Sequence, residues 1–399
     1  MDLGDARDRL EHEVERRADL LLDVSHRIHE HPELNFEEHH AHDLLTATLE
    51  AAGLDVTRSA HGLDTAFVAR AGTEGPTVAV ICEYDALPGI GHACGHNVIA
   101  AAGLGAGLAA AALADELGGQ IVVMGTPAEE GGGGKVLMAR DGAFDGVDVA
   151  LMVHPADHDL AWMTTIAIQR LAVEYHGEEA HAAAYPELGR NALDAAVLGY
   201  VNVAALRQHI RPDERVHGIF TAAGDKPNIV PAHTAAEWYV RSPSLSTLEP
   251  LKARVLECLR AGSAASGCSM HHHWIDPPYA DLVENPVLSA RYAEHAARRG
   301  RTVRDGATGG GVVGSTDMGN VSHLVPAIHP TIAVAPPGVS IHTPAFTAHA
   351  ASAAGDAAVI DGAVAMALTV ADLWADPGTL DGVRQAFAAA TAEPGPSVL

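Results

Sequence analysis

Positive charge is scarce in this sequence. Its 399 residues include 25 Lys and Arg against 51 Asp and Glu, so the formal net charge is −26, and the only lysines are Lys135, Lys226 and Lys252. A surface this acidic repels phosphate groups, which argues against nucleic acid and anionic membranes as partners. We interpret the acid excess as a solvated surface rather than as an acidic binding face.

Cysteines and long apolar runs are also rare. Four cysteines are too few for a disulfide scaffold in a chain of this length, and we expect them to be reduced: Cys82, Cys94, Cys258 and Cys268. Residues 1–17 are charged and lack the apolar core of a signal peptide. The longest apolar stretch, 98–114, is mostly Ala and Gly, which makes it too short and too weakly hydrophobic to span a bilayer. We therefore expect a cytoplasmic protein.

Apolar residues make up 48% of the chain, and their spacing predicts an α/β domain. The pattern indicates helices at 5–31, 36–52, 98–117 and 135–141, and strands at 65–70, 77–82, 121–127 and 147–153. Strands that alternate with helices in this way predict a mixed, mostly parallel sheet covered by helices.

The pattern changes near residue 170. Strands are indicated at 171–175, 216–223, 233–241 and 269–276, with helices at 191–209 and 248–261. This βαββαβ order predicts a small inserted α+β domain. We predict a catalytic domain formed by residues 1–172 and 286–399, interrupted by the inserted domain at 173–285. The second catalytic part should contain a strand at 331–335 and a long helix at 352–376.

Four short segments place potential metal ligands after predicted strands. They are ACGHN at 93–97, PAEE at 127–130, MVHP at 152–155 and IHTPAF at 341–346. They supply six candidate side chains: Cys94, His96, Glu129, Glu130, His154 and His342. Ligands bind outside the carboxyl ends of strands in open α/β sheets. Thiol, imidazole and carboxylate ligands together suit Zn²⁺ or a similar ion better than Ca²⁺ or Mg²⁺.

Each segment alone has an ordinary explanation. His154 could be a loop histidine, the two glutamates could form a solvated turn, and Cys94 could be a small buried hydrophobic residue. An accidental arrangement would require all of these explanations to hold together. The four segments together therefore favour a metal site.

Further motifs accompany the ligand segments in a fixed order. They are HEHPELNFEE at 29–38, Asp85–Pro88 before Cys94–His96, GTPAEEGGGGK at 125–135, EEAHAAAYPELGRNALDA at 178–195, GSTDMGNVS at 314–322 and IHTPAF at 341–346. With these motifs the chain, over roughly residues 25–376, resembles the M20 family of metallopeptidases and amidohydrolases, in its amidohydrolase branch (subfamily D). Within that branch it is similar to the group containing aminobenzoyl-glutamate hydrolase and peptidase M20 domain-containing protein 2.

The resemblance implies one or two divalent metal ions, Zn or Mn first and Co or Ni as alternatives. Their implied ligands are Cys94, His96, Glu130, His154 and His342. Glu129 would be the general base that takes a proton from a metal-bound water and passes it to the leaving amine. The family's His-x-Asp is replaced by Glu83-Tyr84-Asp85, so Asp85 is expected to orient a ligand while the role of Glu83 stays open. Asn97 replaces the branch's usual Asp and leaves the number of metals open.

The resemblance also implies a homodimer whose inserted domain acts as a lid. His181 would reach the partner subunit's site and stabilise the oxyanion, although an exposed hinge histidine is the alternative. Asn228 and Arg241 resemble residues that hold a substrate carboxylate. For Arg241, an ordinary arginine at a strand end is an equal alternative.

We therefore expect an enzyme that hydrolyses the amide bond of a small N-acyl amino acid, an aminobenzoyl-glutamate-like conjugate or a dipeptide. One alternative is a non-catalytic metal-binding or ligand-binding relative, against which the intact Glu129 argues. Another is an aminopeptidase-like enzyme acting on longer peptides, which the enclosed site of the resembled branch disfavours. His271–His273 are not expected to bind a metal, because alternation along a strand splits them between two faces.

Overall fold

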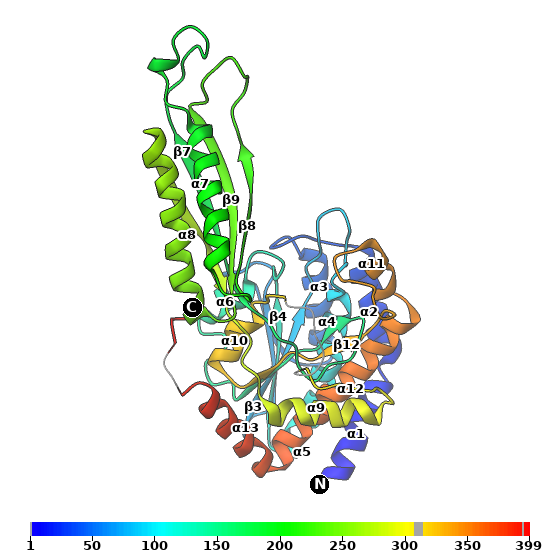
Figure 1. Cartoon of the computed structure of the whole chain (residues 1–399). Helices are drawn as coiled ribbons and strands as arrows, with labels where there is room; N and C mark the ends of the chain where they lie inside the picture. Colours follow the sequence, from blue (N-terminus) through cyan, green and yellow to red (C-terminus); the bar gives the residue numbers. More distant parts are fainter. Residues whose placement is uncertain (1, 307–313, 393–394) are drawn as a thin grey trace. The chain divides into compact units, whose positions relative to one another are not determined.

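The computed structural model describes residues 2–306, 314–392 and 395–399. The chain forms two compact units (Figure 1). The first runs up to Thr164 and resumes at Leu282, and the second comprises Thr165–Asp281 together with Gly395–Val398.

The first unit contains a six-stranded sheet with the order β1-β2-β4-β3-β5-β11. Its strands are β1 Asp55–Arg58, β2 Phe67–Ala71, β3 Thr77–Glu83, β4 Gln120–Thr126, β5 Val149–Leu151 and β11 Ala327–Ile328. β3, β4, β5 and β11 pair in parallel, while β1 and β2 are antiparallel additions at one edge. Two short strands, β6 His154–Ala156 and β12 Thr331–Ala333, form a separate parallel pair. The predicted mixed, mostly parallel α/β sheet is confirmed.

Helices cover this sheet. They are α1 Leu3–Glu15, α2 Ala18–Glu30, α3 His39–Ala51, α4 His96–Ala111, α5 Ala114–Leu117, α6 Gly134–Arg140, α9 Pro286–Arg298, α10 Met318–Leu324, α11 Pro344–Ala350, α12 Ala353–Ala375 and α13 Pro377–Ala390. α4 packs against β3, and α12 packs against α4. Every residue of α4 except its last is buried, which explains why its sequence is apolar on all sides.

One helix of the first unit is long and apolar enough to cross a membrane by length and composition. This helix is α12, and 83% of its most apolar stretch is buried inside the protein. Burial of this kind is typical of a core helix.

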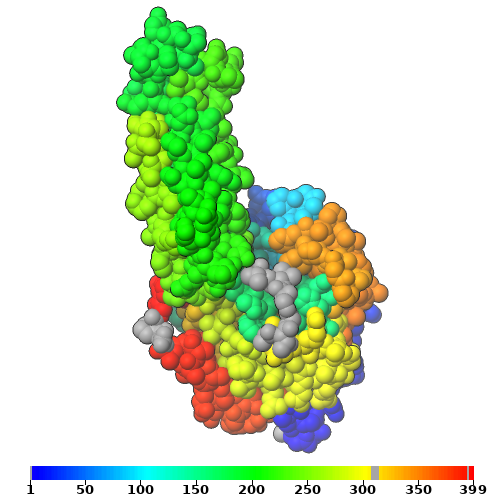
Figure 2. Space-filling view, in the orientation of Figure 1, coloured from blue at the N-terminus to red at the C-terminus, as the bar shows by residue number. Residues whose placement is uncertain are grey.

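The second unit has the order β7-α7-β8-β9-α8-β10, which agrees with the βαββαβ pattern in the sequence. Its elements are β7 Ala167–His176, α7 Ala192–Leu206, β8 Arg215–Ala222, β9 His233–Ser242, α8 Leu245–Ser266 and β10 Ser269–Tyr279. The strands form an antiparallel sheet in the order β10-β7-β9-β8. α7 and α8 lie side by side on one face of that sheet (Figures 1 and 2). The other face carries no helix of the described second unit.

Candidate metal centre

The candidate ligands of the first unit come together although they lie far apart in the sequence. Cys94 Sγ is 3.5 Å from His154 Nε2. Glu130 Oε1 is 3.4 Å from His342 Nε2 and 3.9 Å from His96 Nε2. Potential ligand atoms lie within 4.8 Å of one another in three sets, which are Cys94–His96–His154, Cys94–Glu130–His342 and Glu83–His96–Glu129. The strand ends therefore gather these side chains as the sequence pattern predicted.

The backbone next to these ligands adopts unusual conformations. Gly95 has a φ of +77°, and a Cβ there would lie 2.9 Å from Pro155, so the Cys94-Gly95-His96 turn requires glycine. Ala128, just before Glu129, has a φ of +59°, and His342 has a φ of +62°. Such conformations cost roughly 1–3 kcal/mol each and persist where the surrounding structure enforces them. The strain is located beside the side chains that would bind a metal.

The buried polar atoms of this cluster fit a cation. His96 Nε2, Glu83 Oε1 and Glu130 Oε1 are buried and make no hydrogen bond of normal geometry among the described residues, although Glu83 Oε1 and His96 Nε2 face each other at 3.0 Å. The other ring nitrogen of His96, Nδ1, is 3.1 Å from Asp85 Oδ1. A histidine whose Nδ1 meets a carboxylate presents Nε2 to a metal, which is a common arrangement at metal sites. Burying polar atoms that lack good partners costs free energy, and a bound cation would offset that cost.

Asp85 lies behind this cluster and orders it. Besides His96, it accepts a hydrogen bond from the backbone N–H of Glu130 at 3.0 Å. Asp85 is 1% exposed, so both contacts are shielded from water. Asp85 therefore contacts both the ring of His96 and the backbone of Glu130.

The two adjacent glutamates have different electrostatic environments. Burial, together with the charges of Glu83, Glu130 and Asp317, raises the pKa of Glu129 well above its usual value. Burial also acts to raise the pKa of Glu130, but the close contact with His342 and the charge of His96 outweigh it and lower that pKa. Neighbouring carboxyls whose pKa values are pushed apart can take different roles in a reaction. Glu130 is thus favoured as an anion, and Glu129 as a proton acceptor.

A buried ion network next to the cluster was not predicted from the sequence. Glu83 Oε2 accepts a hydrogen bond from Lys135 Nζ, and Lys135 Nζ is 2.8 Å from Asp317 Oδ1. All three side chains are 0% exposed. Glu83 Oε1 is also 3.0 Å from His96 Nε2, so this carboxylate connects the network to the ligand cluster.

His329 is another residue that the sequence did not indicate. Its ring stacks on the ring of His154, with centroids 5.2 Å apart and an interplanar angle of 27°. His329 is fully buried, and burial lowers the pKa of this side chain to about 3. The only signal that could have identified it is its place in the segment between β11 and β12, where strand ends meet the site.

The remaining predicted site residues belong to the second unit. His181 is exposed, and its backbone forms an isolated bridge with Ile229, next to the hydrogen bond from Ala182 N to Asn228 O at 3.1 Å. Arg241 is partly buried on β9, with its guanidinium 5.8 Å from the ring centre of Tyr239. Burial lowers the pKa of Arg241 from its usual value. His181 and Asn228 thus lie on neighbouring segments of the second unit.

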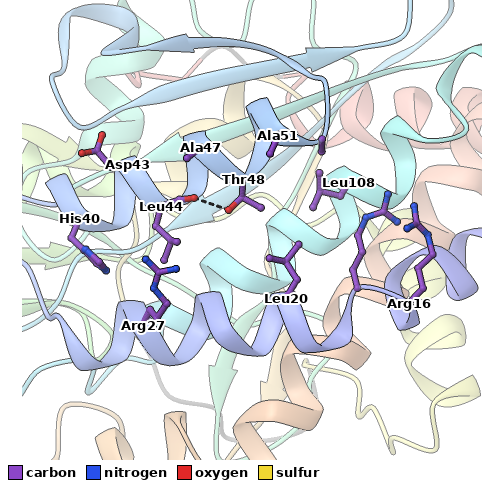
Figure 3. Close-up of a pocket in the computed structure, with 12 residues that line it drawn as sticks. Arg16, Leu20, Arg27, His40, Asp43, Leu44, Ala47, Thr48, Ala51 and Leu108 are labelled. Carbon is purple, nitrogen blue, oxygen red and sulfur yellow. Dashed lines mark hydrogen bonds between the residues drawn. The ribbon is translucent and has the colours of Figure 1, made fainter.

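A groove of the first unit, of about 720 Å³, lies between α2 and α3 (Figure 3). Leu20, Leu44 and Leu108 line it together with Arg16 and other residues. None of the candidate metal ligands lines this groove. Arg16 pairs with Glu13 at 2.6 Å, so the groove does not offer that arginine as an open anion site.

A buried set of thiol, imidazole and carboxylate ligands at the strand ends of an α/β sheet, beside a carboxyl of raised pKa, defines the class of metal-dependent hydrolases. Residues 79–371 match the sequence model of peptidase family M20/M25/M40. The chain belongs to this family and is a hydrolase acting on amide bonds.

Related proteins support this assignment along most of the chain. Xaa-Arg dipeptidase of Mus musculus is 39% identical over 389 residues, covering 94% of this chain and 90% of the relative. A p-aminobenzoyl-glutamate hydrolase polypeptide from Escherichia coli is 35% identical over 263 residues, covering 61% of this chain and 55% of the relative.

Solved structures show the same fold. An aminobenzoyl-glutamate utilization protein from Klebsiella pneumoniae aligns with a TM-score of 0.71 at 20% identity, over 90% of this chain and 98% of the other. A dinuclear metal-binding M20 peptidase from Bacillus subtilis aligns with a TM-score of 0.68 at 20% identity, over 89% and 98% of the two chains.

Proposed function

We propose that this protein hydrolyses the amide bond of a small N-acyl amino acid, an aminobenzoyl-glutamate-like conjugate or a dipeptide in the cytoplasm. The observation that carries the proposal is the pair Glu129 and Glu130. Glu130 lies among the metal-ligand atoms, with its Oε1 3.4 Å from His342 Nε2, and the adjacent Glu129 is buried within 4.8 Å of ligand atoms of His96 and Glu83. That combination places a proton acceptor next to an anionic ligand.

The side chains proposed to hold one or two divalent ions are Cys94, His96, Glu130, His154 and His342. Zn²⁺ and Mn²⁺ are our first choices, with Co²⁺ and Ni²⁺ as alternatives, because similar ligands serve all four ions. Such an ion supplies Lewis acidity, which polarises a carbonyl group and makes water ionise near neutral pH. The clustering of soft and hard donor atoms supports this ligand set, in which Cys94 and His96 are buried and His342 is exposed to solvent.

Glu129 is proposed to move the proton. It is 8% exposed, and its raised pKa lets its carboxylate accept a proton from the attacking water. The carboxylic acid that results can donate the same proton to the nitrogen of the leaving amine. Asp85 holds His96 and the backbone of Glu130 in place and takes no part in the proton transfer.

The second unit is proposed to act as the lid and dimerisation domain. His181 would donate to the oxygen that becomes negative as the amide bond is attacked. Asn228 and Arg241 would bind the carboxylate of the substrate, for which the guanidinium fork of arginine is suited. The neighbouring positions of His181 and Asn228 support a common role for them.

Dipeptides that end in arginine are the first substrates to test. A relative that aligns with 94% of this chain at 39% identity is an Xaa-Arg dipeptidase. The net charge of −26 also favours the approach of a cationic substrate over an anionic one. The panel of test substrates also includes N-acyl amino acids and aminobenzoyl-glutamate, because a second relative is a p-aminobenzoyl-glutamate hydrolase.

Replacement of the proposed base provides the test. Glu129→Gln keeps the shape of the side chain but removes its basicity, so turnover should fall by roughly 10²–10⁴-fold. Metal content, measured by elemental analysis after reconstitution, should stay at the parent value because Glu129 is not among the proposed ligands. Glu74→Gln, an exchange on the exposed surface, is the matched control and should keep full activity.

Two results would contradict the proposal. Parent-like turnover of Glu129→Gln would show that another group moves the proton. Absence of hydrolysis across the whole panel by metal-loaded parent protein would favour a non-catalytic binding protein instead. Hydrolysis restricted to longer peptides would indicate an aminopeptidase.

A further inference from the structure

A second group of potential metal ligands lies on the sheet of the second unit. Glu174 and His176 are on β7, and His233 on β9 is the register partner of His176. His271 on β10 is the register partner of Glu174. All four side chains are exposed. Three neighbouring strands therefore bring imidazole and carboxylate groups to one end of the sheet.

Strand alternation places these side chains on the face that α7 and α8 leave open. Val173 and Tyr175 of β7 are buried in the core of the second unit. Because successive side chains point to opposite faces, Glu174 and His176 project away from that core. The imidazole nitrogens and carboxylate oxygens on this open face are therefore accessible to ions in solution.

The donor atoms are spaced as they would be around a single ion. Glu174 Oε2 is 3.2 Å from His233 Nε2 and 3.4 Å from His176 Nε2. The ligand atoms of these three residues all lie within 4.8 Å of one another. Ligands held at about 2.0–2.2 Å in a tetrahedron are roughly 3.3–3.6 Å apart. Two of the three separations therefore already match such a site.

We propose that Glu174, His176 and His233 bind one first-row divalent cation of the Zn²⁺ type. Two imidazoles and one carboxylate suit Zn²⁺, Ni²⁺, Cu²⁺ or Co²⁺, whereas Ca²⁺ and Mg²⁺ prefer all-oxygen sites. A water molecule completes the fourth position. The ring of His271 lies 5.3 Å from that of His176 and lines one side of the site.

This site changes the interpretation of His271–His273. Alternation does divide the three histidines between two faces: His271 and His273 lie on the open face, whereas His272 is the register partner of the core residue Val173 and lies on the other face. However, the partners of His271 come from neighbouring strands and not from its own strand. Only the register of β7 with β9 and β10 reveals them.

The ion would connect two strands where they leave the sheet. His176 is the last residue of β7, and His233 is the first residue of β9. The backbone N–H of Gly177 donates to Ala232 O at 2.8 Å just beyond them. The segment that follows β7 carries His181, and the segment that precedes β9 carries Asn228. A bound ion would therefore fix the base of both segments.

Zinc binding to the whole, chelator-stripped protein tests the site. The parent should bind one more equivalent of Zn²⁺ per chain than the double variant His176→Ala/His233→Ala, measured by calorimetric titration and elemental analysis. The matched control, His217→Ala/His272→Ala, removes two other exposed histidines of the same sheet and should bind as the parent does. The comparison counts ions and does not depend on the proposed hydrolase activity.

Glu174→Gln separates metal ligation from simple hydrogen bonding. The amide oxygen could still accept hydrogen bonds from both imidazoles, but it lacks the charge of a ligand carboxylate. The affinity of the additional equivalent should fall at least tenfold. Equal stoichiometry in the parent and the double variant would overturn the proposal. Unchanged affinity in Glu174→Gln would also contradict the proposed ligand set.

Discussion

At the scale of single residues, Lys135 carries a positive charge in the protein interior, next to the candidate metal centre. Its ammonium group is fully buried between Glu83 and Asp317. Burial acts to lower the pKa of Lys135, but the two carboxylates outweigh it and raise that pKa. The lysine thereby neutralises carboxylates that would otherwise repel each other beside His96. One of the three lysines of this acidic protein is thus used inside it.

Lys135→Met should destabilise the protein strongly, because it leaves two buried carboxylates without their cation. Removing one partner of a buried ion pair costs roughly 3–5 kcal/mol. Lys226→Met is the matched control, because Lys226 is exposed and substitutions on the surface usually change stability by no more than about 0.5 kcal/mol. Urea unfolding gives both free energies. Equal losses in the two variants would contradict the importance of the buried network.

The ligand cluster and the ion network differ in how far the sequence predicts them. Cys94, His96, Glu129 and His154 are close in space because each follows a strand, and strand ends can be read from hydrophobic spacing. Lys135 and Asp317 meet only because α6 and the segment before α10 approach each other. No local pattern encodes such a contact. Chemistry tied to strand ends is therefore predictable, whereas the buried partners behind it are not.

At the scale of elements, the close packing of α4 against β3 depends on a glycine, Gly103 of α4. A Cβ on Gly103 of α4 would lie 2.5 Å from the carbonyl oxygen of Ile81 and 2.9 Å from Cys82 Sγ. Both atoms belong to β3, the strand that leads toward the site. Gly103 therefore sets the distance between this helix and the sheet, in spite of the cost of glycine in a helix.

Gly103→Ala should destabilise the protein by roughly 1–3 kcal/mol, because the backbone oxygen of Ile81 cannot move aside without shifting β3. Gly382→Ala in α13 is the control, since its added Cβ would meet Val287 at an ordinary 3.8 Å. That exchange should be neutral or stabilise by up to about 1 kcal/mol through helix propensity. Thermal unfolding of both variants checks the contrast, and a stable Gly103→Ala would argue against close packing here.

Helix boundaries were the less predictable part of the elements. The predicted helix 5–31 is two helices, α1 and α2, because the chain leaves helical geometry at Arg17. The apolar spacing continues from Val14 to Leu21, so hydrophobic periodicity cannot show the break. Arg17 Nη1 donates to the carbonyl of Glu13 at 2.8 Å and satisfies an acceptor at the end of α1.

At the scale of the whole molecule, the proposed site draws on residues of both units. The metal ligands and Glu129 belong to the first unit, whereas His181, Asn228 and Arg241 belong to the second. The proposed homodimer would let His181 complete the site of the partner subunit. This arrangement makes activity a property of the pair of subunits.

Mixed dimers provide that test. His181→Ala and Glu129→Gln should each be nearly inactive alone. If His181 acts on the partner's site, a hybrid dimer has one site with both residues intact, whereas action within one chain leaves none. Because random equimolar assembly makes half of the dimers hybrids, co-expression should restore about a quarter of the parent activity. Co-expression of each variant with itself is the control. Hybrids without activity, confirmed as dimers by sedimentation, would place His181 in its own subunit's site or outside catalysis altogether.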